Sequence, residues 1–162
     1  MLKQYAVKVR NNNLAIMDLL GNLIESRELE RSDHINRIKE YTRYIATALM
    51  ELYPEYELTK KKIETIISAS VLHDIGKISI PDSVLLKPGK LTDVGFTIIK
   101  SHTVFGGDLI EQFTDIWGPD LRKTGYDIAM YHHERYDVRG YPKGLVGEDI
   151  PISAQIVSIA DV

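Results

Sequence analysis

The stretch HHERYDVRGYP, residues 132–142, joins two adjacent histidines to a glycine–tyrosine–proline turn. Imidazole nitrogen is a common metal ligand in proteins. Successive residues of a helix point about 100° apart, so His132 and His133 can hold one ion only where the backbone leaves the helix. The stretch fits a ligand pair followed by a substrate loop, and it also fits an ordinary helix end followed by a turn.

A second candidate is VLHDIGK, in which His73 and Asp74 follow an apolar stripe. This position predicts the buried end of a helix, where a carboxylate must be paired or bind a metal. A bridging Asp74 could bind two cations with its two oxygens, and Lys77 could direct a positive charge at an anionic substrate. The alternative is a histidine–aspartate hydrogen bond beside a lysine that faces solvent.

Three weaker signals complete the set. Glu30 and His34 are four residues apart and would share one helix face, although such pairs are often only solvated. His102 stands between two helical patterns, and Asp161 follows an apolar stripe in SIADV. The ordered set places histidine and carboxylate on several different helices, which is the pattern that a multinuclear metal site in a helical bundle requires.

The elements that must position these residues are nearly all helical. Apolar residues recur at three-to-four spacing, which predicts helices around residues 16–24, 35–49, 63–71, 105–113 and 128–130. Thr59 is expected to cap the third of these helices, Gly76 to stop it, and Pro151 to open a last helix. Glycine and proline predict loops over residues 78–90 and 137–149.

The composition is that of an ordinary soluble chain of one domain, with 162 residues, 44% hydrophobic and 27% charged. A net charge of −3 does not favour a general nucleic-acid binder. Cysteine is absent, so any metal must be held by histidine, carboxylate and water, which suits iron, manganese, zinc or nickel. No signal segment or membrane-spanning run is evident, and a cytoplasmic location is expected.

Four ordered motifs, HDIGK, LLKPGKL, HHERYDVRGYPKGL and IPISAQIVSIADV, resemble the HD-GYP branch of the HD superfamily of metal-dependent phosphohydrolases. The resemblance runs from about residue 20 to the end of the chain. It implies an all-α fold, an HD-type helical bundle with a long Gly-Tyr-Pro loop. It also implies a phosphodiesterase that hydrolyses cyclic di-GMP to pGpG, and in some members on to GMP, or that acts on a related cyclic dinucleotide. Members use two or three divalent metal ions, often iron or manganese.

Position by position, the resemblance assigns metal ligands to Glu30, His34, His73, Asp74, His102, His132, His133 and Asp161. Asp74 would bridge one ion beside His34, His73 and Asp161 and a second beside the other three histidines. Glu30 matches the extra carboxylate of members with three metals.

The resemblance assigns catalytic roles to Asp74 and Lys77 and substrate contacts to Lys77, Gly140 and Tyr141. Such cations lower the pKa of a shared water toward about 7, so the expected chemistry is in-line attack on phosphorus. Asp161 or Asp74 could orient that water, and Lys77 would stabilise charge on the phosphate oxygens.

Two departures from the family pattern bear on activity. Val138 stands where the family's loop has glycine, which indicates a turn with positive φ that a β-branched residue resists. The chain also stops one residue after Asp161, before the helix that brings a phosphate-holding arginine and lysine in the family. We therefore expect a linker helix over residues 1–22 and a phosphohydrolase domain over 23–162 that lacks its C-terminal helices.

Three interpretations remain open at this level. The first is a cyclic di-GMP phosphodiesterase, and the second is a weak or inactive regulatory or dimerisation module with the same fold. The third is an HD phosphohydrolase that acts on another nucleotide. The expected partners are a cyclic dinucleotide substrate, an upstream sensor or receiver domain and a second copy of the chain, with no nucleic-acid polymer and no membrane.

Overall fold

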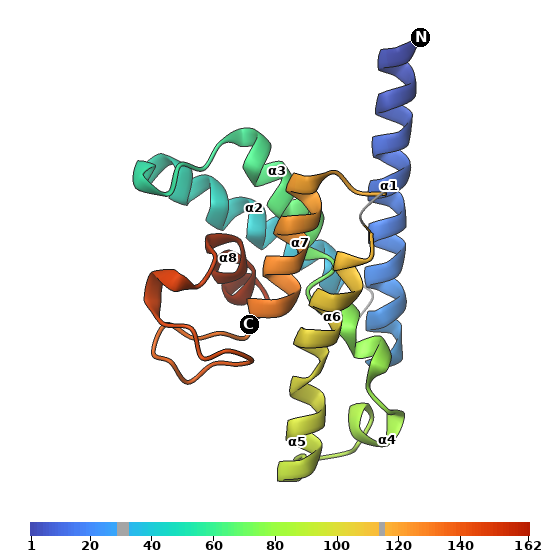
Figure 1. The fold of residues 1–162 in the computed structure, drawn as a ribbon, viewed down its shortest axis with the longest axis vertical. Coiled ribbons are helices and arrows are strands. Elements are labelled where there is room, and N and C mark those ends of the chain that lie inside the picture. Colours follow the sequence, from blue (N-terminus) through green and yellow to red (C-terminus); the bar gives the residue numbers. More distant parts are fainter. Residues whose placement is uncertain (29–32, 114–115) are drawn as a thin grey trace.

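The computed structural model describes residues 1–162 except 29–32 and 114–115, and it leaves out the side chains of residues 2 and 3. The described residues form helices and loops and contain no strand beyond one isolated bridge between Asp137 and Val146. This confirms the expected all-α class (Figure 1). The elements are α1 (Leu2–Glu25), η1 (Ser26–Glu28), α2 (His34–Leu52), η2 (Pro54–Tyr56), α3 (Lys60–Ser70), η3 (Ile75–Ser79), α4 (Asp82–Leu85), α5 (Asp93–Lys100), α6 (His102–Glu111), α7 (Pro119–Tyr131), η4 (Gly147–Asp149) and α8 (Ile152–Ala160).

The helix α7 lies at the centre of the bundle, against α3, α6 and α8. One buried apolar cluster joins α2, α3, α7 and α8 through side chains such as Ile67, Ile128 and Ile156. A second cluster joins α1 to α6 and to the turn after α3 through Met17, Leu72 and Ile110. The predicted three-to-four spacing of apolar residues is what supplies these two clusters.

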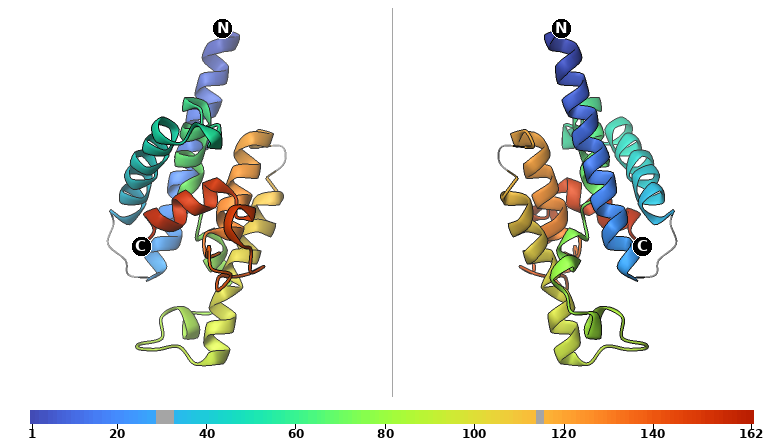
Figure 2. Two further views of the ribbon diagram at one scale, coloured as in Figure 1. Left: turned by 90° about the vertical axis from the view of Figure 1, so that its left-hand side faces the viewer. Right: turned by 90° about the vertical axis from the view of Figure 1, so that its right-hand side faces the viewer.

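Only the C-terminal half of α1 packs on the bundle. Met17 and Ile24 are buried there. Gly21 between them is required by close packing, because a Cβ atom at this position would lie 2.6 Å from the carbonyl oxygen of Val71. The N-terminal half extends beyond the other helices (Figures 1 and 2).

Three local predictions can be compared directly with the structure. Thr59 caps α3 as expected, since its Oγ1 accepts a hydrogen bond from the backbone N–H of Lys62 at 3.2 Å. The prediction that Gly76 stops this helix is wrong, because α3 already ends at Ser70 and Gly76 lies inside η3. The predicted loop over 78–90 contains the short helix α4.

Gly76 has a packing role instead. A Cβ atom on it would lie 1.8 Å from the carbonyl oxygen of His102, so only glycine lets η3 approach the start of α6 so closely. This contact sets the spacing between Asp74, two residues before Gly76, and His102.

None of the described helices is long and apolar enough to cross a membrane.

Candidate metal centre and active site

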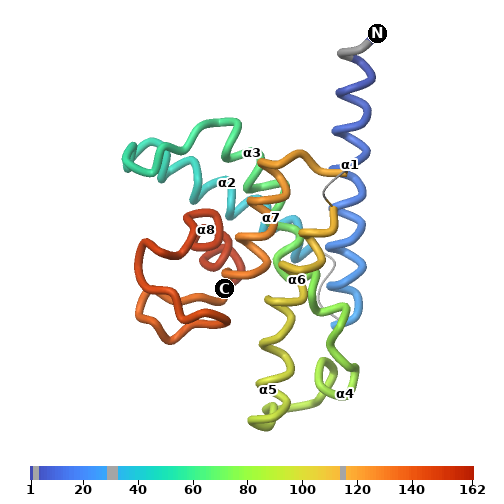
Figure 3. Tube along the Cα trace, in the orientation of Figure 1, coloured from blue at the N-terminus to red at the C-terminus, as the bar shows by residue number. Residues whose placement is uncertain are grey.

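The site lies where the ends of several helices meet (Figure 3). His73 and Asp74 occupy the turn after α3, where the last hydrogen bonds tighten to three-residue spacing. The other residues stand at or just past the ends of α2, α6, α7 and α8, namely His34, His102, His132, His133 and Asp161. A helix end lets adjacent side chains turn toward one point, as the double histidine requires.

Three buried histidines are oriented by the same kind of hydrogen bond. In each, Nδ1 lies within hydrogen-bond distance of a carbonyl oxygen of the preceding turn: 2.9 Å from His73 to Ser70, 2.7 Å from His102 to Ile99 and 2.9 Å from His132 to Ile128. A carbonyl can only accept, so Nδ1 carries the proton and donates it. This arrangement directs each Nε2 inward and fixes the ring, as second-shell hydrogen bonds do for metal-binding histidines.

The carboxylate of Asp74 divides these histidines into two groups. Its Oδ1 lies 3.2 Å from His102 Nε2 and 3.7 Å from His132 Nε2. Its Oδ2 lies 3.2 Å from His73 Nε2. Each oxygen of one carboxylate therefore faces a different set of imidazole nitrogens, which is the geometry that a bridging ligand needs.

A second cluster adjoins the Oδ2 side. Asp161 Oδ1 lies 3.3 Å from His73 Nε2 and 3.5 Å from His34 Nε2. Glu25 Oε1 lies 3.6 Å from His34 Nε2. Ligand atoms of Glu25, His34 and His73 lie within 4.8 Å of one another, and the same holds for Asp74, His102, His132 and His133 on the other side.

Whether the site suits a cation can be judged from two buried polar atoms at its centre. His73 Nε2 and Asp74 Oδ1 are buried and have no hydrogen-bond partner among the described residues. Buried polar atoms without a partner are costly. Here His73 Nε2 lies 3.2 Å from Asp74 Oδ2, and Asp74 Oδ1 lies 3.2 Å from His102 Nε2, so a cation between these atoms would satisfy them. The donors are all nitrogen and oxygen, which suits divalent transition metals. The residues present therefore fit a metal centre.

The pKa values of these groups respond to burial and to one another. Burial lowers the pKa of His73, but the charges of Asp74 and Asp161 oppose it and hold this pKa well above its usual value. Burial raises the pKa of Asp74, but the charge of His73 and the close rings of His102 and His132 hold it well below its usual value. For Asp161, burial is outweighed in the same way by His73, and the pKa falls to about 2. Without a cation, a proton on His73 thus balances the carboxylates.

The double histidine behaves in the opposite way. Burial lowers the pKa of His132 and is only partly opposed by Asp74. Burial and the neighbouring charges of His132 and His102 lower the pKa of His133 to about 3. Both side chains are therefore neutral at pH 7, the form in which imidazole binds metals.

Lys77 stands at the edge of the cluster between two carboxylates. Its Nζ lies 2.8 Å from Asp74 Oδ2 and 2.7 Å from Glu28 Oε1. Burial lowers the pKa of Lys77, but Asp74 and Glu28 raise it by more. A cavity of about 310 Å³ opens here, lined by Glu25, Glu28, His34, Asp74, Lys77, His133 and Asp161. The cavity gives an anionic ligand access to both the lysine and the cluster.

The ring of Tyr141 stacks on the ring of His133, with centroids 4.8 Å apart and planes 26° from parallel. Phe96 of α5 approaches the same tyrosine edge-on at 6.4 Å. Lys100 Nζ lies 4.8 Å from the centroid of Phe96 and 5.7 Å from that of Tyr141. The rings of Tyr141 and Phe96 and the ammonium group of Lys100 thus border the histidines on the loop side.

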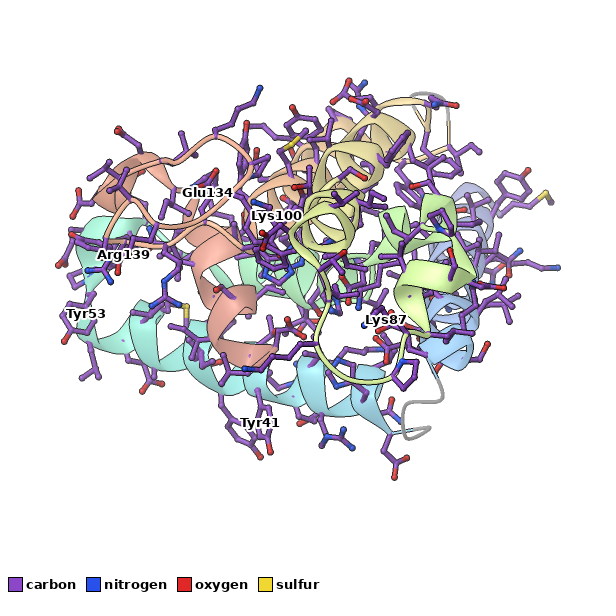
Figure 4. All side chains as sticks on the ribbon, turned by 90° about the horizontal axis from the view of Figure 1, so that it is seen from below. Tyr41, Tyr53, Lys87, Lys100, Glu134 and Arg139 are labelled. Carbon is purple, nitrogen blue, oxygen red and sulfur yellow. The ribbon has the colours of Figure 1, made fainter. Side chains whose placement is uncertain are left out.

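The loop is held by a buried carboxylate, Glu134 (Figure 4). Glu134 Oε1 accepts hydrogen bonds from the backbone N–H groups of Lys143 and Gly144 at 2.6 and 3.1 Å. Glu134 Oε2 accepts one from Leu145 at 2.9 Å. These charge-assisted bonds fix the returning arm of the loop directly beside the double histidine.

Gly140 and Val138 occupy demanding backbone positions in the loop. A Cβ atom on Gly140 would lie 2.2 Å from the backbone nitrogen of Arg135, so this glycine packs on the chain just after the histidines. Val138 has φ of 67°, the left-handed conformation that the family's glycine indicated. The loop keeps its turn and places a valine in it, at a cost on the order of 1 kcal/mol.

The structure brings together seven of the eight sequence-predicted metal ligands, and Lys77 and Tyr141 lie beside them. The eighth, Glu30, lies outside the described residues. Three carboxylates at the site were not predicted: Glu25, Glu28 and Glu134. The sequence showed Glu134 directly after the double histidine, and its place before a glycine-rich loop is the signal that could have identified it.

A protein-family model described as HD domain matches residues 19–162 of the chain. A probable cyclic di-GMP phosphodiesterase of Vibrio cholerae is 40% identical over 152 residues, which cover 91% of this chain and 34% of that protein. The cyclic di-GMP phosphodiesterase response regulator RpfG of Xanthomonas campestris is 40% identical over 171 residues, covering 99% and 43%. A 3′3′-cGAMP-specific phosphodiesterase 2 of Vibrio cholerae is 36% identical over 156 residues, covering 96% and 28%.

The chain thus spans less than half the length of each of these relatives. The match to the family model nevertheless covers every described residue of the site, because all of them lie after residue 19. The Gly-Tyr-Pro loop and the cyclic-dinucleotide phosphodiesterases among these relatives both indicate the HD-GYP branch. The chain belongs to the HD domain family of metal-dependent phosphohydrolases, in its HD-GYP branch.

Proposed function

We propose that this chain is a metal-dependent phosphodiesterase domain that hydrolyses cyclic di-GMP to pGpG, with onward hydrolysis to GMP as a second step. The observation that carries the proposal is the position of the Asp74 carboxylate, whose two oxygens face separate histidine groups at 3.2 Å. Names of relatives support the substrate, since several are called cyclic di-GMP phosphodiesterases.

The proposed metal ligands are His34, His73, Asp74, His102, His132, His133 and Asp161, with Glu25 or Glu30 as an extra carboxylate. Divalent metals are the cofactors of HD phosphohydrolases, and iron or manganese is our choice for this donor set. Glu25 lies beside His34 in the structure. Glu30 stays a prediction from the sequence.

Bound cations of this kind supply an activated water and neutralise charge on a phosphate. The residues of the chain provide the rest of the chemistry. Asp74 and Asp161 remain ionised at pH 7 because neighbouring histidines keep their pKa values low, so each can orient the attacking water. Lys77 offers an ammonium group at the cavity for the non-bridging phosphate oxygens.

The loop supplies a place for a base. Tyr141 presents an aromatic ring whose one side stacks on His133, and Phe96 and Lys100 adjoin it. Stacking on an aromatic ring contributes about 1–3 kcal/mol per base. We propose that a guanine of the substrate packs against this group while its phosphate meets Lys77. The packing of Gly140 on Arg135 would hold the tyrosine in place.

A second candidate substrate is 3′3′-cGAMP. The observation in its favour is the 36% identity to a 3′3′-cGAMP-specific phosphodiesterase. Aromatic stacking does not distinguish guanine from adenine, so both nucleotides suit the loop. We also propose, from the sequence, that the chain works in the cytoplasm. Its linker helix would give way to the phosphohydrolase domain near residue 22, and its partner would be an upstream sensor or receiver domain.

The test is hydrolysis after metal loading. The purified chain would be treated with chelator, loaded with Fe²⁺ or Mn²⁺, and incubated separately with cyclic di-GMP and 3′3′-cGAMP, with products resolved by liquid chromatography. We expect pGpG to form, and chelation or Asp74→Asn to abolish it. Binding of about two metal ions without hydrolysis of either nucleotide would instead favour the regulatory module. Hydrolysis of 3′3′-cGAMP alone would reassign the substrate.

A further inference from the structure

The solvent-facing side of α1 carries a seven-residue repeat. Its members are four and three residues apart in alternation: Tyr5, Val9, Asn12, Ile16, Leu19 and Leu23. The apolar members keep much of their surface exposed, from 40% at Val9 to 71% at Tyr5. Such spacing places all six along one stripe of a helix. We call this stripe the α1 seam.

The domain's own packing does not account for the α1 seam. The side chains that α1 buries on the bundle are Met17, Gly21 and Ile24. At about 100° per residue, this buried face points more than a quarter-turn away from the α1 seam. The helix therefore has one face for its own domain and a second apolar face that the described residues leave uncovered.

We propose that the α1 seam binds the α1 seam of a second copy of this chain as a parallel two-stranded coiled coil. Val9, Ile16 and Leu23 would occupy the a positions, and Tyr5, Asn12 and Leu19 the d positions. Val9 and Ile16 at a, with Leu19 at d, follow the pattern that favours two parallel strands. Asn12, the one polar member of the α1 seam, would meet Asn12 of the other copy at a d position, and a shifted register would place its amide against apolar side chains.

Charge along the flanks fits two identical helices. The positions beside the seam are Ala6, Lys8, Asn13, Ala15, Leu20 and Asn22, of which Lys8 alone is charged. In a parallel pair Lys8 faces Asn13 of the other copy, so no like charges meet across the interface. A helix whose flanks carry only one charged residue can approach a copy of itself closely.

The apolar area also suits a dimer. The exposed apolar side chains of one α1 seam present on the order of 500 Å², so two copies would bury about 1,000 Å² before their flanks are counted. With the flanking residues the total reaches the ~1,200 Å² at which specific interfaces begin. Tyr5 and Val9 also border a groove of about 570 Å³ between α1, α3 and the start of α7, which leaves room beside the N-terminal half of α1.

The first test is the oligomeric state of the intact chain, measured by sedimentation velocity over a concentration series. We expect a monomer–dimer equilibrium. The double substitution Ile16→Glu with Leu23→Glu places like charges across the interface and should weaken dimerisation at least tenfold. The matched control is Val7→Glu, which changes a 58% exposed valine on the opposite side of α1 and should leave the dimer intact.

The second test fixes the orientation and does not depend on the acidic variants folding well. The chain contains no cysteine, so a single introduced cysteine can form a disulfide only with the same cysteine of another copy. Leu19→Cys should form a disulfide-linked dimer under mild oxidation, because d positions of parallel strands face each other. Val7→Cys should remain monomeric on denaturing gels.

Three outcomes would overturn the proposal. The first is a wild-type chain that stays monomeric at every concentration tested. The second is a dimer that the acidic seam variant forms as tightly as the wild type. The third is equal cross-linking at positions 7 and 19. Because these readouts do not involve nucleotide hydrolysis, they stand apart from the test of the proposed function.

Discussion

Lys77 and Glu28 form an ion pair beside the histidine cluster, with Lys77 Nζ 2.7 Å from Glu28 Oε1 and 2.9 Å from Glu28 Oε2. The same Nζ meets Asp74 on its other side. If this lysine is to hold a substrate phosphate, Glu28 occupies the position that an anion would take. In that case the carboxylate would compete with the substrate for the lysine.

Removing the charge of Glu28 should therefore improve substrate binding. In Glu28→Gln we expect KM for cyclic di-GMP to fall about three- to tenfold, because a charge-assisted bond of roughly 1 kcal/mol or more no longer opposes binding. Steady-state kinetics of the metal-loaded chain measures this. The control is Glu64→Gln, which removes an exposed ion pair with Arg43 away from the site. A KM that rises in Glu28→Gln would show that Glu28 assists binding instead.

The position of Asp74 between two groups of histidines gives a second prediction. Asp74→Asn keeps the shape of the side chain but removes the charge that faces two histidine groups, so metal content should drop and hydrolysis should fall at least about 100-fold. Atomic absorption and product chromatography report the two effects. Asp127→Asn is a suitable control, because Asp127 is also nearly buried but pairs with Lys123 instead of histidines. Full metal content in Asp74→Asn would rule out a bridging role.

Val138 offers a test of backbone strain. Its φ of 67° costs an L-residue about 1 kcal/mol or more, whereas glycine adopts this angle freely. Val138→Gly should raise the free energy of unfolding by up to about 1 kcal/mol and lower KM, while Tyr141→Ala should raise KM and metal content should change in neither. Urea denaturation and nucleotide titration measure these effects.

The same loop provides a matched control for this substitution. Val146 is 52% exposed, close to the 54% of Val138, but its φ is −119°. Val146→Gly should therefore lose about 0.5–1 kcal/mol, since it adds chain entropy without relieving strain. Equal effects of the two glycine substitutions would show that φ at Val138 is not a source of strain.

The sequence predicted the residues of the site better than their surroundings. Histidines and aspartates at helix ends could be identified because apolar periodicity locates the helices and their ends. The positions of Glu25 and Glu28 depend on the end of α1 and on η1, which are held by tertiary contacts such as the hydrogen bond from Arg27 to the carbonyl oxygen of Lys77 at 2.6 Å. The early end of α3 at Ser70 was likewise not predicted, because the apolar periodicity continues to Val71 and Leu72 while the backbone hydrogen bonds already change to three-residue spacing.

Glu134 should act as a positioning residue for the loop. It accepts three backbone hydrogen bonds while almost fully buried, so Glu134→Gln turns an acceptor into a donor facing an N–H group. We expect KM to rise about tenfold, with kcat and metal content nearly unchanged, since the loop and not the metal ligands would shift. The exposed Glu148, in the same loop region, supplies the control Glu148→Gln. Equal loss of kcat and of metal would place Glu134 among the ligand supports instead.

The lowered pKa of His133 predicts how the stability of the metal-free protein responds to acid. Its pKa is about 3 in the folded chain, below the ordinary value of about 6.5 that it regains on unfolding. Between these values the unfolded state binds the extra proton, so stability falls as pH falls through this window. From pH 7 to pH 5 the loss should be about 2 kcal/mol at most.

The measurement is urea unfolding of chelator-treated protein at both pH values. In His133→Gln the group cannot titrate, so the loss between pH 7 and pH 5 should be smaller than in the wild type by most of that amount. His73 has a raised pKa and acts with the opposite sign, losing its contribution as pH rises above about 6.5, and it is present in both proteins. Identical pH dependence in the two proteins would mean that His133 keeps its ordinary pKa when folded, and that burial beside His132 and His102 does not hold it neutral.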